Sequence, residues 1–438
     1  MHQCSSAAAI AMIVVAVLLP GVGHVLAAEG ASVVKIARTG KGYQMTRNGQ
    51  PYFARGVCGG SRLDELVAAG GNSIRTYGPT GLDAAGEKGL TVLLGLNTGK
   101  PRHGFDYGDA RRVSAQKESI RQTVLRLKDH PALLMWALGN ETELDASDAD
   151  RIRVWKALNE LAEMIRQIDP NHPVITVVAG IGRNKLAELK EHCPALDAVG
   201  INAYGGMLSL PEQIARQQWD KPYLVTEFGP RGHWEVPKTT WGIPIEDDST
   251  TKADLYERAY RRAVADQPSC LGSYVFLWGQ KQEKTHTWYG MFLPDGSPLN
   301  AVDAMTLVWT GKWPANRCPR IGPGAMKVSR RGAAPDEKQR IFPSGSHLEC
   351  SVDAEDPDGD AITVKWDLRI DVADNPSRGG DREPPTPPIE GAVLSAAGKE
   401  AVIQVPAKPG KYRVFAYVYD PQGRAATVNV PILAQGQP

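Results

Sequence analysis

Short apolar runs alternate with longer amphipathic stretches from about residue 33 to residue 310, which is typical of repeated β-strand and α-helix units. Each apolar run is almost continuous, as expected for a parallel strand that is buried on both faces. Eight such runs predict strands at 52–57, 72–78, 90–97, 132–140, 173–180, 196–204, 222–229 and 272–279. The segments 114–130 and 148–169 carry apolar residues three and four positions apart and predict helices. The pattern predicts an α/β protein that begins with a (β/α)8 TIM barrel.

The segments on either side of the predicted barrel follow other patterns. Residues 33–53 predict a β-hairpin that leads into the first strand, with Asn48-Gly49 as its turn. Residues 314–345 are rich in Pro, Gly, Arg and Lys and predict a linker. From residue 346 to 438, apolar and polar residues alternate with a period of two between turn signals, which predicts a small immunoglobulin-like β-sandwich. The barrel domain with its hairpin is therefore expected to span 28–313.

The N-terminus resembles an export signal. An apolar run extends from Ala7 to Leu19, and Val25 and Ala27 occupy the small-residue positions that precede a signal-peptidase cut. The run is short for a membrane-spanning helix. We expect residues 1–27 to be a signal peptide and the mature protein to be periplasmic or secreted, with no membrane contact after the signal is removed.

The net charge and the cysteine spacing exclude several classes of partner and of cofactor site. The net charge is +1 at pH 7 over 438 residues, so neither nucleic acid nor an anionic membrane surface is an expected partner. No CxxC spacing is present, and we expect neither a metal nor an organic cofactor. Beyond Cys4, which lies in the predicted signal, an odd number of cysteines remains, so at least one thiol must stay free. Two pairings are open among them, Cys193 with Cys270 and Cys318 with Cys350.

Two glutamates end apolar runs at positions suited to catalysis. Glu141 lies in WALGNETE (136–143) and Glu227 in PYLVTEFGP (222–230). A (β/α)8 barrel presents its catalytic groups at the C-terminal ends of its strands. A retaining glycosidase requires one carboxylic acid as proton donor and one carboxylate as nucleophile, about 5 Å apart. The predicted fourth and seventh strands face one another across the barrel, so these two glutamates are candidates for that pair.

With these motifs the chain resembles the clan A glycoside hydrolases, and its barrel is most similar to the catalytic barrel of family 2. In GNE, the resemblance implies that Glu141 is the acid/base and that Asn140 holds the 2-hydroxyl of the sugar. In TEFG, it implies that Glu227 is the nucleophile. The resemblance further implies supporting roles for Arg75 and Tyr204 beside the nucleophile, and for Trp278 as the floor of the sugar subsite.

The remaining candidates lie on loops at the same rim. We expect outer subsites to be lined by Asn202, Trp234 and Trp288, with Tyr289 beside them. Glu143 and Glu283 are expected to be solvated loop charges. The histidines that could touch substrate are His103, His233 and His286, whose spacing forms no metal-ligand set.

The resemblance to family 2 is incomplete. From the short segment before the first predicted strand, we expect no counterpart of the N-terminal sandwich domains of that family. The motifs that mark β-galactosidases and β-glucuronidases are also absent, so the monosaccharide stays open. RTYG and EFG are also similar to segments of glucan-remodelling members of the clan, including β-1,3-glucanosyltransferases. In the C-terminal part, DAEDPDGD (353–360) is dense in oxygen ligands for calcium but also forms a good hairpin turn, which we favour. This part resembles polycystic-kidney-disease-type and cadherin-like modules, which bind polysaccharide or space a catalytic domain.

Three functions fit this pattern. The favoured one is a retaining β-glycoside hydrolase that acts on an extracytoplasmic β-glucan or another β-linked oligosaccharide. The second is a β-glucan transglycosylase that uses the same two glutamates and passes the sugar to another sugar instead of water. The third is a non-catalytic carbohydrate-binding protein on a barrel scaffold, which the close pair of repelling carboxylates disfavours.

Overall fold

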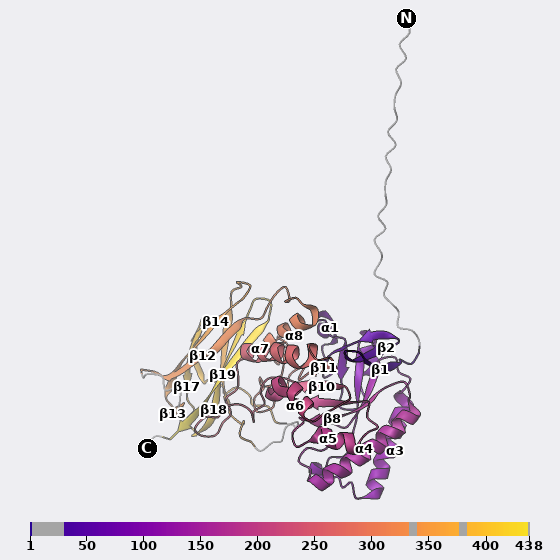
Figure 1. The fold of residues 1–438 in the computed structure, drawn as a ribbon. Helices are drawn as coiled ribbons and strands as arrows, with labels where there is room; N and C mark the ends of the chain where they lie inside the picture. Colours follow the sequence, from indigo (N-terminus) through magenta and orange to yellow (C-terminus); the bar gives the residue numbers. More distant parts are fainter. Residues whose placement is uncertain (2–29, 333–339, 376–382, 437–438) are drawn as a thin grey trace.

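The structure is a computed structural model that describes residues 1, 30–332, 340–375 and 383–436. The predicted signal peptide lies outside the described residues, apart from Met1. The described chain forms a barrel with a small N-terminal sheet and a C-terminal two-sheet unit beside the barrel (Figure 1).

The eight predicted barrel strands are confirmed. They form a closed parallel barrel in which β11 returns to pair with β4. The strands are β4 (Ala54–Cys58), β5 (Ser73–Arg75), β6 (Thr91–Leu96), β7 (Leu133–Leu138), β8 (Val174–Ala179), β9 (Ala198–Asn202), β10 (Tyr223–Phe228) and β11 (Cys270–Val275). Their side chains are buried almost without exception, because one face fills the barrel interior and the other packs against the helices.

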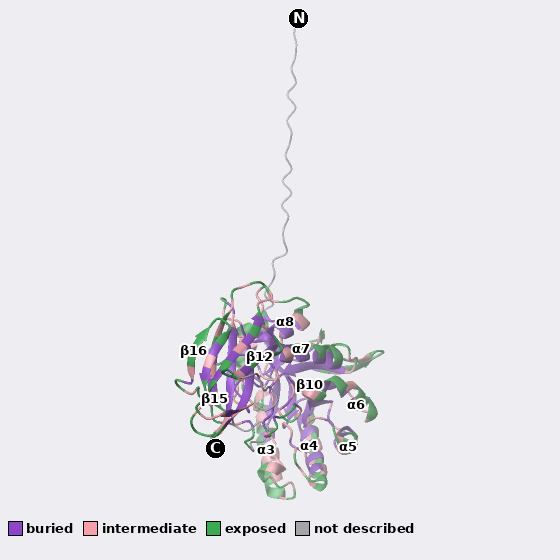
Figure 2. Ribbon diagram, turned by 90° about the vertical axis from the view of Figure 1, so that its left-hand side faces the viewer, coloured by how far each residue is buried: buried purple, intermediate pink, exposed green. Residues whose placement is uncertain are grey.

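Helices surround the barrel and present polar residues to solvent, so their outer faces are exposed and their inner faces buried (Figure 2). The α-helices are α1 (Leu63–Ala68), α2 (Leu82–Glu87), α3 (Ala110–Leu127), α4 (Asp148–Ile168), α5 (Lys185–His192), α6 (Leu210–Arg216), α7 (Ser249–Tyr260) and α8 (Asn300–Thr310). In α4, the side chain of Ser147 caps the first turn by accepting a hydrogen bond from the Asp150 amide. Val154, Leu158 and Ile165 are buried among the residues of the barrel core, as their helical spacing predicts.

A three-stranded sheet closes the N-terminal end of the barrel. It consists of β1 (Val34–Thr39), β2 (Gly42–Arg47) and β3 (Gln50–Tyr52). The predicted turn at Asn48-Gly49 joins β2 to β3, with both residues at positive φ. The predicted hairpin is thus extended by a further strand. Val34 and Met45 pack with side chains from inside the barrel, so this sheet belongs to the barrel core.

The C-terminal unit is a sandwich of two four-stranded sheets. One sheet has the order β12 (Arg320–Arg330), β14 (His347–Glu355), β17 (Glu400–Gln404), β16 (Val393–Ala397). The other has the order β13 (Ile341–Pro343), β19 (Ala425–Gln435), β18 (Gly410–Tyr419), β15 (Thr363–Ile370). Apolar side chains of both sheets meet in a common core.

The predicted linker 314–345 requires correction, because it contains β12 and β13. Ile321, Met326 and Val328 of β12 are buried in the sandwich core, whereas most of the residues between and after them are exposed. The Pro and Gly residues lie where the pairing of β12 with β14 is irregular, between Ile321 and Met326. A composition rich in Pro, Gly, Arg and Lys therefore concealed an edge strand.

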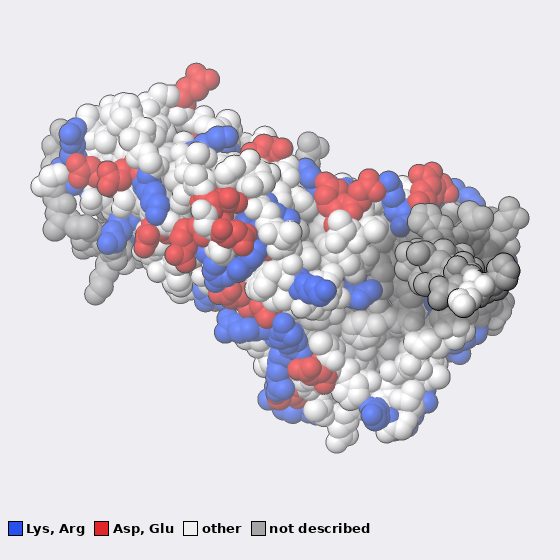
Figure 3. Space-filling model, turned by 90° about the horizontal axis from the view of Figure 1, so that it is seen from above, with Lys and Arg blue, Asp and Glu red and all other residues white. Residues whose placement is uncertain are grey.

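The cysteine pairings considered from the sequence are also corrected. Among the described residues, every cysteine is a buried free thiol: Cys58, Cys193, Cys270, Cys318 and Cys350. At 353–360, Asp356 accepts hydrogen bonds from the amides of Asp358 and Asp360 and so stabilises a turn. Within the described ranges, no helix is long and apolar enough to cross a membrane. Acidic and basic side chains are mixed over the face drawn in Figure 3.

Candidate active site

The two candidate glutamates lie at the C-terminal end of the barrel, on β10 and just after β7. Glu227 is part of β10 and is 5% exposed. Glu141 follows β7 in a tight turn in which Gly139 has φ 69° and Glu141 has φ 52°. The Glu141 amide donates to the carbonyl of Val177 in β8 (2.9 Å), which anchors the turn to the neighbouring strand. A non-glycine residue at positive φ is uncommon and marks a backbone held in place by its surroundings.

Three donors hold the carboxylate of Glu227. Its Oε1 accepts hydrogen bonds from Nη1 of Arg75 (2.9 Å) and from the hydroxyl of Tyr77 (2.8 Å). Its Oε2 accepts a hydrogen bond from the hydroxyl of Tyr204 (2.9 Å). Arg75 is 1% exposed and also donates to the carbonyl of Thr226 (2.7 Å). An ion pair with two further O–H donors fixes both oxygens of a carboxylate in one orientation.

Glu141 has a different environment. Its Oε1 accepts a hydrogen bond from Nδ2 of Asn202 (2.9 Å). Burial and, after it, the nearby negative charge of Glu227 together raise the pKa of Glu141 to about 7, against the opposing hydrogen bond from Asn202. At neutral pH, a carboxyl group with this pKa is protonated in a substantial fraction of the molecules. This is the property required of a general acid.

Two asparagines connect the glutamates. Oδ1 of Asn140 accepts hydrogen bonds from Nη2 of Arg75 (2.7 Å) and from Nδ2 of Asn202 (3.1 Å). Oδ1 of Asn202 accepts a hydrogen bond from the hydroxyl of Thr226 (2.9 Å). The network joins residues at the ends of β5, β7, β9 and β10, so the site is held together by the barrel itself.

Aromatic side chains form one wall of the site. The ring of Tyr204 makes edge contacts with Tyr289 (5.6 Å between centroids), Trp234 (5.7 Å) and Phe276 (6.2 Å). Trp234 is 56% exposed. Glu141, Tyr204 and Trp234 line a cavity of about 400 Å³. The cavity therefore places an exposed indole beside the proton donor. Such a cavity is suited to bind a leaving group whose apolar face packs on the indole.

The structure corrects the predicted position of Trp278. Its ring is 1% exposed and packs against Phe292 (5.0 Å) and Trp309 (6.4 Å) in the core beside α8. The strand before it ends at Val275, earlier than the sequence pattern predicted. Phe276 lies closer to the catalytic residues, through its contact with Tyr204. Among the other aromatic candidates, Trp288 is buried, with its Nε1 donating to the carbonyl of Arg231.

Two glutamates expected to be solvated are buried. Glu143 accepts hydrogen bonds from Lys185 (2.7 Å) and from the Ala179 amide (2.9 Å). Glu283 forms an ion pair with Lys281. Each of the two carboxylates can be buried because a lysine is paired with it. The sequence shows only that both glutamates lie in loops, so it predicted solvated side chains.

One histidine candidate faces away from the site, and one residue of the site was not identified from the sequence. His286 is buried against the sandwich, where its Nε2 lies 2.8 Å from the hydroxyl of Tyr417. His233 lies at the rim against Trp234. Tyr77, which donates to Glu227, was not singled out from the sequence. It lies two positions after Arg75 in the same RTYG segment, and this proximity was the available signal.

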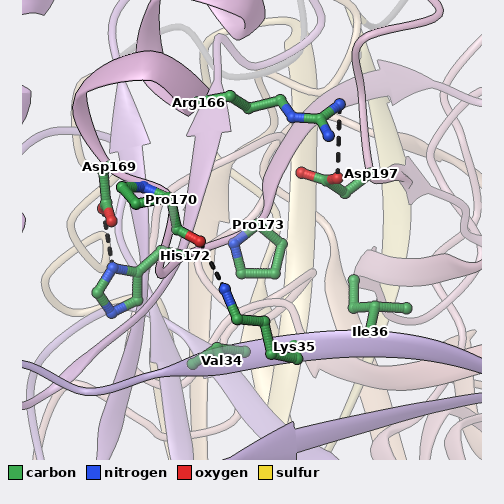
Figure 4. A pocket seen from close by; sticks show the side chains of 9 residues that line it. All are labelled: Val34, Lys35, Ile36, Arg166, Asp169, Pro170, His172, Pro173 and Asp197. Atoms are coloured by element: carbon green, nitrogen blue, oxygen red, sulfur yellow. Dashed lines mark hydrogen bonds and ion pairs between the residues drawn. The ribbon is translucent and has the colours of Figure 1, made fainter.

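A second cluster has the connectivity of a hydrolase triad but is not a reaction site. At the opposite end of the barrel, beside the hollow drawn in Figure 4, Nδ1 of His172 lies 2.8 Å from Asp169 and its Nε2 lies 2.8 Å from the hydroxyl of Ser32. The Ser32 hydroxyl donates to the carbonyl of Leu133 (2.6 Å), and Ser32 is 1% exposed. A nucleophile must be reachable by substrate, so this cluster only fastens the N-terminal segment to the barrel.

Comparison with known proteins agrees with this geometry. Residues 77–233, which include both glutamates, match the family model of the glycosyl hydrolases family 2, TIM barrel domain. A β-glucuronidase of Streptococcus agalactiae is 25% identical over 253 residues, which cover 49% of this chain and 39% of that protein. A probable mannan endo-1,4-β-mannosidase A of Aspergillus clavatus is 22% identical over 269 residues, covering 54% of this chain and 72% of that protein.

Solved structures support the fold. A calcium-binding mutant of β-glucuronidase 2 from Bacteroides uniformis aligns with a TM-score of 0.50 at 13% identity, over 92% of this chain and 48% of that protein. This chain therefore spans about half of that structure and less of the streptococcal relative.

Proposed function

We propose that the chain is a retaining β-glycosidase of clan A that acts on a β-glucan or another β-linked oligosaccharide, which the match of residues 77–233 to the family 2 TIM barrel domain supports. The observation that carries this proposal is the difference between the two glutamates. Glu227 is fixed by Arg75, Tyr77 and Tyr204, whereas burial raises the pKa of Glu141 to about 7. This difference matches the division of labour between nucleophile and acid.

The reaction then proceeds in two steps. In the first, a carboxylate oxygen of Glu227 attacks the anomeric carbon while Glu141 gives its proton to the glycosidic oxygen, so the C–O bond to the leaving group breaks as the glycosyl ester forms. In the second, Glu141, now a carboxylate, takes a proton from water, whose oxygen attacks the same carbon and releases Glu227. Both steps use groups that the chain itself supplies.

Asn140 and the aromatic wall would position the sugar. Asn140 is held by Arg75 and Asn202 and lies next to Glu141 in the chain, so we assign to it a hydrogen bond to the substrate. Phe276 replaces Trp278 as the aromatic residue that we place beside the reacting sugar ring. Trp234 and the cavity beside Glu141 would receive the leaving group.

Transglycosylation is the second candidate, and the same cavity favours it. A sugar that binds between Glu141 and Trp234 would compete with water for the glycosyl ester. The two outcomes differ in product length, because hydrolysis shortens the substrate and transfer also gives longer chains.

The test is a product analysis of the wild type and of Glu227→Gln. Both would be incubated with β-linked gluco-, manno-, galacto- and xylo-oligosaccharides and with aryl β-glucuronides, and the products would be identified by mass spectrometry. We expect products from the wild type with retained anomeric configuration, and none from the variant. Binding without turnover by the wild type would instead support the carbohydrate-binding alternative.

Two further features belong to the proposal. We propose that residues 1–27 direct export, because they carry the apolar run and small residues of a signal peptide. The sandwich resembles polycystic-kidney-disease-type and cadherin-like modules in its alternating pattern and turns. Cell fractionation with an antibody against the barrel would test export, with a cytoplasmic location contradicting it.

A further inference from the structure

The loop of residues 284–289 connects the catalytic centre to the C-terminal sandwich. All six of its residues are buried, although the segment contains no helix or strand. At its C-terminal end, Tyr289 packs edge-on against Tyr204, with 5.6 Å between ring centroids. Tyr204 donates the hydrogen bond to Oε2 of Glu227. The position of this loop therefore affects a direct partner of the candidate nucleophile.

The sandwich contacts the N-terminal half of the same loop. The amide of Lys284 donates to Oε2 of Glu383 (2.7 Å), and Nζ of Lys284 donates to the carbonyl of Asn375 (2.6 Å). Nε2 of His286 lies 2.8 Å from the hydroxyl of Tyr417 on β18. These contacts come from two separate parts of the sandwich, so the loop is held from more than one direction.

A buried carboxylate, that of Glu246, joins the loop to β19. Its oxygens accept hydrogen bonds from the hydroxyls of Thr285 (2.6 Å) and Thr287 (2.9 Å) and from Nζ of Lys252 (2.5 Å). Nδ2 of Asn429 in β19 donates to Oε2 of the same carboxylate (2.8 Å). Glu246 is 5% exposed, so each of these partners is needed to satisfy a charge that water cannot reach.

Asn429 is itself fixed within the sandwich. Its Oδ1 accepts a hydrogen bond from Nη1 of Arg413 (2.7 Å). Arg413 also donates to Asp371 (2.8 Å) and to the carbonyl of Pro244 (3.0 Å) in the loop after β10. Domains of one chain usually move relative to one another unless their interface is extensive. Here buried ionic groups of both units share one network.

We propose that the sandwich is a structural part of the active site, in which Asn429 is a positioning residue that acts through Glu246 and the 284–289 loop on Tyr289 and Tyr204. Asn429 contacts neither the substrate nor the catalytic glutamates Glu141 and Glu227. This inference rests on the proposed glycosidase function, because its effect is measured as turnover.

A double-mutant cycle in kcat tests the proposal. The variants are Asn429→Leu, Tyr204→Phe and the combination of both, assayed on the oligosaccharide that the wild type cleaves. We expect Asn429→Leu to lower kcat roughly threefold to thirtyfold with little change in KM, and Tyr204→Phe to lower it about 10²-fold. If Asn429 acts through Tyr204, the double variant is no slower than Tyr204→Phe alone, because the second change removes what the first one disturbs.

Two further variants separate positioning from general destabilisation. Ile403→Val alters the sandwich core away from the barrel and should leave kcat within about twofold. Tyr417→Phe removes the partner of His286 and should repeat the non-additive behaviour with Tyr204→Phe, and it serves in place of Asn429→Leu if that variant does not fold. Additive effects, or an unchanged kcat in Asn429→Leu, would overturn the inference while leaving the proposed function intact. An inactive wild type would overturn the proposed function first, and this inference with it.

Discussion

Glu227 accepts hydrogen bonds from Arg75, Tyr77 and Tyr204, whereas Glu141 is half-buried and accepts a hydrogen bond from the neutral amide of Asn202. At the scale of single residues, these partners decide the chemistry of each carboxylate. Burial without a direct cationic partner favours the protonated form of Glu141, whereas the guanidinium and the two hydroxyls fix both oxygens of Glu227 in one orientation. Two residues of the same type can therefore serve as acid and nucleophile within one site.

The pH dependence of the rate should report the proton on Glu141. Because burial raises the pKa of Glu141 to about 7, the acid form is lost as the pH rises through about 7. We expect kcat/KM to fall above that pH in the wild type. In Glu141→Gln the basic limb should disappear, and the rate on oligosaccharides should drop by about 10²- to 10⁴-fold. Aryl glycosides with acidic leaving groups should lose much less, since such groups leave without a proton. A basic limb that persists in Glu141→Gln would assign it to another group.

The raised pKa of Glu141 predicts that the folded protein becomes less stable as the pH rises. Between the ordinary value of 4.5 and about 7, the folded state holds a proton on Glu141 that the unfolded chain has lost. The free energy of unfolding should therefore decrease as the pH rises through this range, by up to about 3 kcal/mol. Glu141→Gln cannot ionise, so its stability relative to the wild type should increase between pH 4.5 and pH 8. Urea unfolding at both pH values measures this, with the exposed Glu87→Gln as the matched control. Equal differences at the two pH values would contradict the expectation.

At the scale of elements, the turn after β7 determines where Glu141 points. A Cβ atom on Gly139 would lie 2.2 Å from the hydroxyl oxygen of Thr142 and 2.4 Å from that of Thr98. Gly139→Ala should therefore displace the turn and lower kcat/KM strongly, in addition to the roughly 1–2 kcal/mol that positive φ costs an L-residue. Gly89 has the same φ of 69° with no atom near its missing side chain, so Gly89→Ala is the matched control. Both variants would be compared by urea unfolding and by enzyme kinetics. Because only Gly139→Ala introduces the close contact, the comparison separates its effect from the effect of positive φ. Equal activity in the two variants would show that the turn adapts.

Element type could be predicted from the sequence more reliably than element ends. The barrel strands were recognisable because burial on both faces leaves continuous apolar runs. The last run was predicted at 272–279, but β11 ends at Val275, so Trp278 was assigned to the site when it packs beside α8. The edge strand β12 was missed, because its Pro, Gly, Arg and Lys content is that of a linker and its pairing with β14 is irregular. Asn140, Asn202, Arg75 and Tyr204 were placed together because strand ends meet at one rim of a barrel.

At the scale of the whole molecule, the barrel and the sandwich share buried charges. Besides the Glu246 network, Arg424 of the sandwich forms an ion pair with Asp303 of α8, and the Thr427 amide donates to Ser249 of α7 (2.8 Å). The sandwich lies along the α7 and α8 side of the barrel (Figure 1). Since separating the two units would break these shared ion pairs and hydrogen bonds, we expect them to unfold together.

Arg413 gives the sharpest test of this coupling. It is 1% exposed and paired with the buried Asp371, so Arg413→Met should lower the free energy of unfolding by about 3–5 kcal/mol. The control Arg331→Met removes an exposed pair with Glu349 and should cost less than about 1 kcal/mol. Calorimetry should show a single transition in the wild type, shifted to lower temperature in Arg413→Met, with activity lost over the same range. Two separate transitions, of which Arg413→Met lowers only one, would show that the sandwich folds independently, and its network with Glu246 would then be a contact between autonomous domains.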